Sequence, residues 1–318
     1  MKQALITGIC GQDGSYLAEL LLAKGYGVHG LTRVGDTAVP APLRGRVTLH
    51  IGDLANKTSI EAVIVETRPD EIYHLAGQSH VHASFEMPEY TADVTAMGTL
   101  RVLEAMRQHA PVARLFYAST SEMFGQSNPL PVSETARLDP INPYAASKVF
   151  GYNVVSIYRR AHGLFACTGI LFNHESPRRG AGFVTQKIAC AAARIAAGLE
   201  TTLPLGNLDA RRDWGFAGDY VDAMWRMLQA DAPDDYVIAT GASHSVGELC
   251  EVAFAHVGLD YRKYVVSDRE LVRSGEIAET RGDASKAKRQ LGWEPTVPFE
   301  RLVQMMVDAQ RQRLEESQ

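Results

Sequence analysis

The chain has 318 residues, of which 46% are apolar and 22% charged, as is ordinary for a globular protein with a sizeable core. Its formal net charge of −5 argues against a nucleic-acid partner or an anionic membrane surface. The four cysteines form no CxxC pair, no segment reaches the length of a membrane span, and the N-terminus lacks signal-peptide features. These properties predict a cytoplasmic enzyme with free thiols.

Apolar strands and helices alternate along the first half of the chain. The predicted strands lie at residues 3–8, 27–33, 46–54, 71–77 and 114–120. The predicted helices lie at residues 15–27, 59–69 and 88–109. Strands that are apolar along their whole length are buried on both faces, so the pattern predicts an α/β fold with a Rossmann-type, doubly wound parallel sheet.

The pattern becomes less regular after about residue 170. A strand and four helices are predicted there, at residues 235–241, 183–199, 219–230, 246–258 and 300–318. We therefore expect a dinucleotide-binding domain over residues 1–170, to which later segments return. A smaller, mixed α/β substrate domain is expected over residues 171–318.

The segment TGICGQDGSYL, residues 7–17, follows the first strand and opens the first helix. Gly8, Gly11 and Gly14 allow a tight turn and let backbone N–H groups approach a pyrophosphate at the positive end of the helix. The segment predicts a dinucleotide site, and the alternative is a purely structural turn between strand and helix.

The ends of the second and third strands bear on which dinucleotide binds. The second strand ends in Arg33 rather than in the carboxylate typical of NAD sites, and arginine suits a 2′-phosphate. This favours NADP over NAD, although Arg33 as a solvated surface charge is the alternative. Asp53 follows the third strand, where it is placed to meet the adenine end of a cofactor or to cap a helix.

A candidate catalytic group follows the fifth strand. Tyr144 and Lys148 are spaced to lie on one helix face, where an ammonium group would lower the pKa of the tyrosine. Thr120 or Ser119, at the carboxyl end of the strand, can hydrogen-bond a substrate hydroxyl. Glu122 can move a proton. The alternative is that Glu122 is only a carboxylate at the start of a helix.

The stretch ILFNHESPRRG, residues 170–180, runs from a strand directly into charge. It could be a surface turn, a metal site or the place of an anionic ligand. A metal site is not expected, because His174 and Glu175 are adjacent, point different ways on a strand and have no third ligand nearby. Basic residues at 178–187 and 211–212 instead suit a small anion, with a solvated arginine pair as the alternative for 211–212.

Several stretches together resemble one family over nearly the whole chain. They are GQDGSYLA, ASTSEMFG, ILFNHESPRRG, LGNLDARRDWGFAGDYVDAMW and the late LGW. On these the chain resembles an extended short-chain dehydrogenase/reductase and is very similar to the GDP-mannose 4,6-dehydratase family.

The resemblance implies a reaction on a nucleotide sugar. Tyr144 would take the proton from O4 while the C4 hydride moves to NADP. Glu122 would then remove the C5 proton and help to expel the C6 hydroxyl as water, and the hydride would return to C6. Thr120 would orient O4, and Lys148 would hold the cofactor ribose.

The resemblance also implies binding residues, position by position. Those for the cofactor are Gly8, Gly11, Gln12, Asp13, Gly14, Arg33, Asp53, Leu54, Leu75, Tyr144 and Lys148. Those for the GDP-sugar are Ser79, Asn173, Lys187, Arg212, Arg273 and Glu276.

The chain departs from the family pattern at several places. The segment TRVGDTAVPAPLRGR is short where the family has an arginine-rich stretch that reaches a neighbouring subunit, so we expect a homodimer, with a homotetramer as the alternative. Asn142 borders the expected sugar pocket where the family commonly has a different sequence. Ser274 and Ala278 replace a proline and an aspartate.

These departures leave two alternative functions open. The first is a reductase or epimerase of a GDP-4-keto-6-deoxyhexose, or a dehydratase of a related GDP-sugar such as a GDP-heptose. The second is a catalytically silent protein that binds a nucleotide sugar or NADP(H), which the intact catalytic set argues against.

Overall fold

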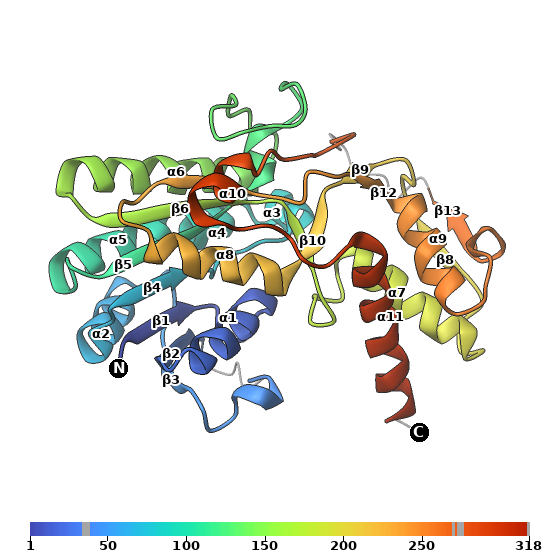
Figure 1. Cartoon of the computed structure of the whole chain (residues 1–318), viewed down its shortest axis with the longest axis horizontal. Helices are drawn as coiled ribbons and strands as arrows, with labels where there is room; N and C mark the ends of the chain where they lie inside the picture. Colours follow the sequence, from blue (N-terminus) through green and yellow to red (C-terminus); the bar gives the residue numbers. More distant parts are fainter. Residues whose placement is uncertain (34–38, 269–270, 272–276, 317–318) are drawn as a thin grey trace.

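The computed structural model describes residues 1–33, 39–268, 271 and 277–316, and a parallel sheet forms its centre (Figure 1). Within these residues the sheet has seven strands in the order β11-β6-β5-β4-β1-β2-β3. The strands are β1 Gln3–Thr7, β2 Gly27–Thr32, β3 Thr48–Ile51, β4 Glu71–His74, β5 Arg114–Thr120, β6 Phe165–Leu171 and β11 Asp235–Ile238. The chain order reverses between β1 and β4, which is where ligands bind in such sheets, and the predicted fold class is confirmed.

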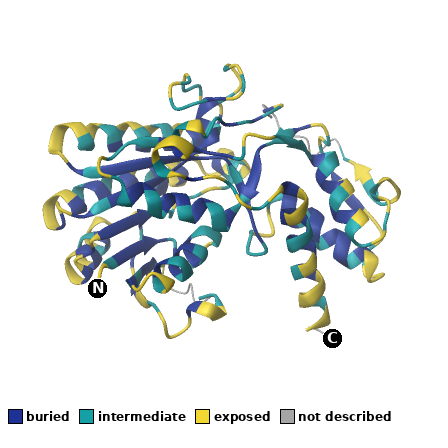
Figure 2. Ribbon diagram, in the orientation of Figure 1, coloured by how far each residue is buried: buried dark blue, intermediate teal, exposed yellow. Residues whose placement is uncertain are grey.

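Helices cover both faces of the sheet (Figures 1 and 2). One face packs against α1 Gln12–Ala23, α8 Ala217–Gln229 and α10 Ser285–Leu291. The other packs against α2 Lys57–Thr67, α5 Gly98–His109 and α6 Pro143–His162. Neighbouring residues of a strand point to opposite faces, and in β1 Ile6 joins the first core and Leu5 the second. Burial on both faces explains why the strands read as continuous apolar runs.

Several predicted bounds differ from the observed ones, among them those of the strand at 71–77 and the helix at 88–109. The strand predicted at 71–77 ends at His74, because the N–H groups of Leu75 and Ala76 donate to the Thr7 hydroxyl at 3.1 and 3.0 Å instead of to a neighbouring strand. The helix predicted at 88–109 consists of α4 Pro88–Thr91, the π-helical segment η2 Ala92–Met97 and α5. Short helices also occur at α3 Val81–Glu86, η1 Ala41–Leu43, η3 Ser121–Phe124 and η4 Tyr261–Lys263.

The later part of the chain adds short strand pairs and a second group of helices, seen at the right of Figure 1. The pairs are β7 Asn173–Glu175 with β10 Trp214–Phe216, β9 Arg211–Arg212 with β12 His244–Ser245, and β8 Leu203–Leu205 with β13 Val265–Ser267. The helices are α7 Val184–Ala196, α9 Val246–His256 and α11 Phe299–Glu315, which share one apolar core. Because α8 and β11 join the large sheet, the chain returns to it after residue 171, and the domain boundary itself stays a prediction.

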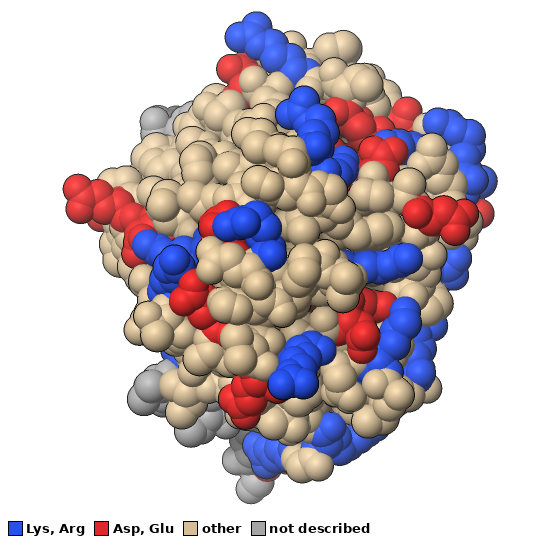
Figure 3. All heavy atoms as spheres, turned by 90° about the vertical axis from the view of Figure 1, so that its left-hand side faces the viewer, with Lys and Arg blue, Asp and Glu red and all other residues tan. Residues whose placement is uncertain are grey.

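The molecular surface carries charges of both signs. On the face drawn in Figure 3, lysines and arginines are interspersed with aspartates and glutamates. Among the described helices, none is long and apolar enough to cross a membrane.

Candidate functional site

The glycine loop between β1 and α1 is closely packed. Gly8 has a φ of +76°, a conformation that residues with a side chain rarely adopt. A Cβ on Gly14 would lie 2.3 Å from the Gly8 carbonyl oxygen, so only glycine fits where α1 crosses the turn. Gly11 is the N-cap residue of α1 and supplies no side chain to the first turn. The backbone N–H groups of this turn can therefore face an anion, as the geometry of a dinucleotide site requires.

The glycine loop is joined by a partly buried polar network to residues 173–176, which we call the NHES segment. His174 lies 2.8 Å through Nε2 from the Asp13 carboxylate, and its Nδ1 lies 2.7 Å from the Phe172 carbonyl oxygen. The Gln12 amide donates to the His174 carbonyl oxygen at 3.0 Å and accepts from the Ser176 hydroxyl at 2.8 Å. Both ring nitrogens of His174 are engaged by protein groups, so the NHES segment serves as a contact to the glycine loop.

The charges of this network depend on each other. Burial by itself raises the pKa of Asp13, but the charge of His174 and its hydrogen bond outweigh this effect and lower the pKa to about 2. Burial opposes the charge on His174 as well, yet the neighbouring Asp13 raises the pKa of the imidazole above its ordinary value. A partly buried ion pair therefore links β7 to the first turn of α1.

The two arginines of the segment hold it in place. Arg178 donates to Glu19 at 2.7 Å and lies 4.2 Å above the ring of Tyr16. Arg179 lies 3.0 Å from the buried Glu175. Both guanidinium groups therefore have a carboxylate partner within the protein, which the residue types alone did not predict.

The predicted catalytic residues come together at the carboxyl end of β5. Thr120 ends β5 and forms a hydrogen bond with Tyr144 in the first turn of α6. Lys148 is buried one helical turn further on and donates to the Ala118 carbonyl oxygen at 2.6 Å. Its ammonium group lies 5.9 Å from the centre of the Tyr144 ring.

The predicted lowering of the Tyr144 pKa is wrong in this structure. Burial raises the pKa of Tyr144 to about 12, and the hydrogen bond from Thr120 only partly opposes this effect. Burial also lowers the pKa of Lys148 to about 8. The spacing of the two residues was correct, but a short sequence motif does not reveal that both side chains are removed from water.

Glu122 forms a hydrogen bond with Asn142, which we predicted only as a residue that borders the sugar pocket. Its backbone N–H donates to the Thr120 hydroxyl at 3.3 Å, and its carboxylate Oε2 accepts from the Asn142 amide at 3.1 Å. Asn142 is also the N-cap residue of α6, where its side chain accepts from the Ala145 N–H at 2.8 Å. The signal in the sequence was Asn142 followed directly by a proline, which is typical of a capped helix start.

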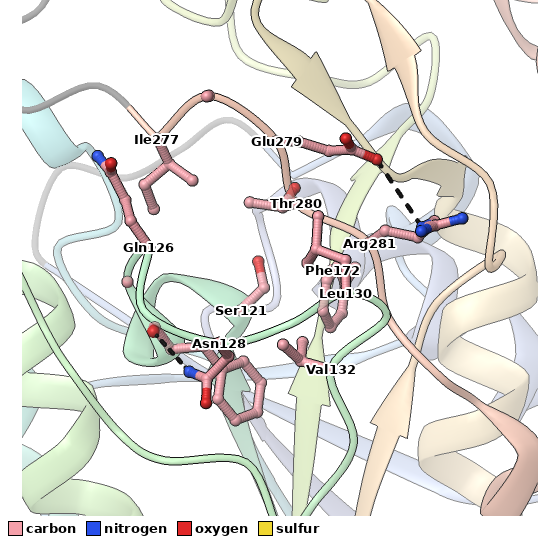
Figure 4. Close-up of a pocket in the computed structure, with 13 residues that line it drawn as sticks. Ser121, Gln126, Asn128, Leu130, Val132, Phe172, Ile277, Glu279, Thr280 and Arg281 are labelled. Atoms are coloured by element: carbon pink, nitrogen blue, oxygen red, sulfur yellow. Dashed lines mark hydrogen bonds and ion pairs between the residues drawn. The ribbon is translucent and has the colours of Figure 1, made fainter.

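A hollow of about 210 Å³ lies next to this group, between the loop after β5 and residues 277–281 (Figure 4). Its apolar wall includes Phe172 and Val132, and its polar lining includes Ser121 and Thr280. Ser121 directly precedes Glu122, so the hollow adjoins the predicted catalytic residues. Aromatic and hydroxyl groups together suit a polar organic ligand such as a sugar.

The remaining predicted cofactor residues lie along the ends of β2, β3 and β4. Arg33 donates to the Tyr90 hydroxyl at 3.1 Å. Asp53 is not the N-cap of α2, because Asn56 occupies that position and accepts from the Ser59 N–H, while Asp53 accepts from the N–H of a neighbouring residue. Leu54 is buried and Leu75 half-buried. Their contacts to a cofactor stay predictions.

The predicted substrate residues are spread over several later elements. Asn173 lies in β7 opposite Trp214 of β10, and Ser79 is exposed after β4. The Lys187 ammonium group donates to the Pro204 carbonyl oxygen at 2.7 Å. Arg212 lies in β9 and donates to the preceding carbonyl oxygen at 2.8 Å. Their contacts to a substrate also stay predictions.

Two further predictions concern Arg211 and the pair formed by Arg273 and Glu276. Arg211 is not part of a solvated pair, because it donates to Glu248 at 2.7 Å and to the Ser243 carbonyl oxygen at 2.8 Å. Arg273 and Glu276 lie outside the described residues.

The parallel sheet, the glycine loop and the helix that carries Tyr144 and Lys148 define a Rossmann-type enzyme of the short-chain dehydrogenase/reductase class. Within this class, the chain belongs to the GDP-mannose 4,6-dehydratase family, whose model matches residues 5–306.

Relatives and solved structures agree with this membership. GDP-mannose 4,6 dehydratase 1 of Arabidopsis thaliana is 52% identical over 96% of this chain and 89% of its own length. DesIV, a dTDP-glucose 4,6-dehydratase of Streptomyces venezuelae solved with NAD and TYD, superposes with a TM-score of 0.87 at 26% identity, over 99% of this chain and 98% of that one. RMD of Pseudomonas aeruginosa, solved with NADPH, superposes with a TM-score of 0.85 at 25% identity, over 98% and 100%.

Proposed function

We propose that the protein dehydrates GDP-mannose to GDP-4-keto-6-deoxymannose. Family membership over residues 5–306 supports the substrate and the reaction. The observation that carries the proposal is the convergence of Thr120, Glu122 and Tyr144. The Thr120 hydroxyl accepts from the Glu122 backbone N–H, and the side chains of both residues act on the pKa of Tyr144. We further propose that the hexosyl group reaches them through the hollow beside Ser121.

The proposed reaction needs Tyr144 and Glu122 to move protons at the sugar. Tyr144 accepts the O4 proton as the C4–H bond breaks. Glu122 then takes the C5 proton, which the C4 ketone acidifies, and delivers a proton to the departing C6 hydroxyl, which leaves as water. When the hydride returns to C6, Tyr144 gives its proton to C5, so both side chains regain their starting states. When bound, an oxidised nicotinamide would supply the acceptor for the C4 hydride and the donor for C6. Its positive charge would favour the phenolate form of Tyr144, whose pKa burial raises to about 12.

One incubation tests the reaction. The purified protein is incubated with GDP-mannose and no added cofactor, and a product lighter by one water is sought by mass spectrometry. We expect Glu122→Gln to retain cofactor binding and lose dehydration. NADPH oxidation with the 4-keto-6-deoxy sugar, in the absence of any product from GDP-mannose, would instead establish a reductase.

The cofactor in this proposal is a nicotinamide dinucleotide, and NADP rather than NAD. The fit of an anion to the Gly8–Gly14 turn supports a dinucleotide, and Arg33 at the end of β2 supports a 2′-phosphate. We expect Arg33→Ala to weaken NADP binding by about tenfold or more and to leave NAD binding unchanged, as titration calorimetry can measure. Equal losses for both dinucleotides would contradict the assignment.

We propose a cytoplasmic homodimer as the working form. Exposed apolar side chains on α3, on α6 and between Met87 and Met97 support a second copy as the partner, and they are Phe85, Met87, Tyr90, Met97, Phe150 and Ile157. Four free cysteines support a reducing compartment. Sedimentation equilibrium separates the dimer from the alternative homotetramer.

A further inference from the structure

Asn142 occupies a position between the two proton-handling residues of the site. It is buried, at 8% exposure, and immediately precedes the proline that opens α6. Its side-chain oxygen accepts from the Ala145 N–H at 2.8 Å, and its side-chain nitrogen donates to Glu122 Oε2 at 3.1 Å. One amide therefore caps the helix that carries Tyr144 and also holds the carboxylate of Glu122.

The helix cap decides which way this amide faces. The Ala145 N–H requires an acceptor, so the oxygen of Asn142 must point to the helix. The NH₂ group then has to point to Glu122. A flipped amide would place its oxygen, an acceptor, against the carboxylate, which is also an acceptor. It would also place its NH₂ group, a donor, against the Ala145 N–H, which is also a donor. The donor to Glu122 is therefore held in place by the fold.

The amide also limits the orientation of the carboxylate. The backbone N–H of Glu122 donates to the Thr120 hydroxyl, which fixes the backbone. Its carboxylate Oε2 accepts from Asn142, which fixes one end of the side chain. Among the described residues, Asn142 is the hydrogen-bond donor to this carboxylate, and Oε1 accepts from none of them. Oε1 is thus available to a substrate proton while Oε2 is fixed.

We propose that Asn142 is a positioning residue that orients the Glu122 carboxylate relative to Tyr144 during dehydration, an inference that rests on the proposed function. Tyr144 follows Asn142 in the first turn of α6, so the cap sets the position of both groups at once. Aspartate at this position would cap the helix but would bring a second negative charge to Glu122 and no donor. Glycine is tolerated at a helix N-cap and supplies no side-chain donor.

The substitutions Asn142→Gly and Asn142→Asp test the proposal, because both residues are favoured at a helix N-cap. For GDP-mannose we expect kcat to fall about 10- to 100-fold, the effect of one hydrogen bond to a charged group, with KM and bound cofactor within about twofold of the wild type. Reduced cofactor should accumulate at 340 nm, because C4 oxidation proceeds and C5 deprotonation does not. The acid limb of the pH profile should move to higher pH in Asn142→Asp.

A matched control separates positioning from capping. Asn56 caps α2 through the Ser59 N–H and is no neighbour of Glu122 in the chain, so Asn56→Gly changes a cap of the same kind. We expect it to leave kcat unchanged. Wild-type kcat and pH profile in both Asn142 variants would overturn the positioning role. So would a loss of kcat that only follows losses of thermal stability and bound cofactor.

The same assay distinguishes this failure from failure of the proposed function. If the wild-type protein forms no keto sugar from GDP-mannose, the proposed function fails and the role of Asn142 fails with it. If the wild type is active and the Asn142 variants match it, only the role of Asn142 is wrong.

Discussion

The ion pair between Asp13 and His174 should contribute measurably to stability, and Asp13→Asn removes its charge. The pair joins the first turn of α1 to the NHES segment across 2.8 Å, and the exposed fractions of the two side chains are 22% and 11%. Asparagine is nearly isosteric with aspartate, so the substitution changes the charge with little change in packing. The imidazole of His174 is left without its counter-charge.

The pKa of the carboxyl group sets the size of the effect. Its fall from the ordinary 3.8 to about 2 corresponds to about 2 kcal/mol, since each pKa unit is worth ~1.4 kcal/mol. We therefore expect Asp13→Asn to lower the free energy of unfolding by about 2 kcal/mol, within a factor of two. Urea denaturation of the cofactor-free protein near pH 5.5 measures it.

The effect should depend on pH in a defined direction. The folded-state pKa of Asp13 is depressed, so its contribution is present above pH 3.8 and is lost as pH falls toward about 2. The folded-state pKa of His174 is raised, so its contribution is complete below 6.5 and is lost as pH rises through the raised value. The difference between wild type and Asp13→Asn should be largest between about pH 4 and 6.5.

A second ion pair of the same chemistry provides the control. His256 and Asp308 lie 2.7 Å apart between α9 and α11, but the aspartate side chain is 47% exposed. Exposed pairs typically contribute under about 1 kcal/mol, so Asp308→Asn should have a small effect. If Asp13→Asn destabilises the protein no more than Asp308→Asn does, then burial does not strengthen the first pair and the reasoning is refuted.

Three further outcomes are expected. Gly14→Ala should abolish cofactor binding in calorimetry, because its Cβ would meet the Gly8 carbonyl oxygen at 2.3 Å, whereas Gly247→Ala, whose Cβ would meet nothing closer than 3.5 Å, should bind normally. Tyr144→Phe should lower the rate of C4 oxidation at least about 100-fold in single turnovers without loss of folding, and a near-normal rate would exclude Tyr144 as the proton acceptor. The rate of C4 oxidation should decline as pH rises through about 8, where Lys148 loses its charge, and Lys148→Arg should remove that decline.

Much of the fold followed from local patterns in the sequence. Continuous apolar strands that alternate with helices imply burial on both faces, and the observed sheet has that form. The conformation of the Gly8 turn and the placement of Tyr144 and Lys148 on one helix also depend on residues close together in the chain. Periodicity and backbone preference act over a few residues, so they can be recognised without tertiary structure.

The tertiary structure alone decided which side chains meet and how far they are removed from water. His174 contacts Asp13 across 161 positions, and Asn142 contacts Glu122 across 20. The pKa of Tyr144 is raised rather than lowered, because burial acts more strongly on it than the lysine on the same helix. Such contacts and burial arise when distant segments pack together, and for that reason local sequence determined the elements of this protein while the folded chain determined the chemistry of its site.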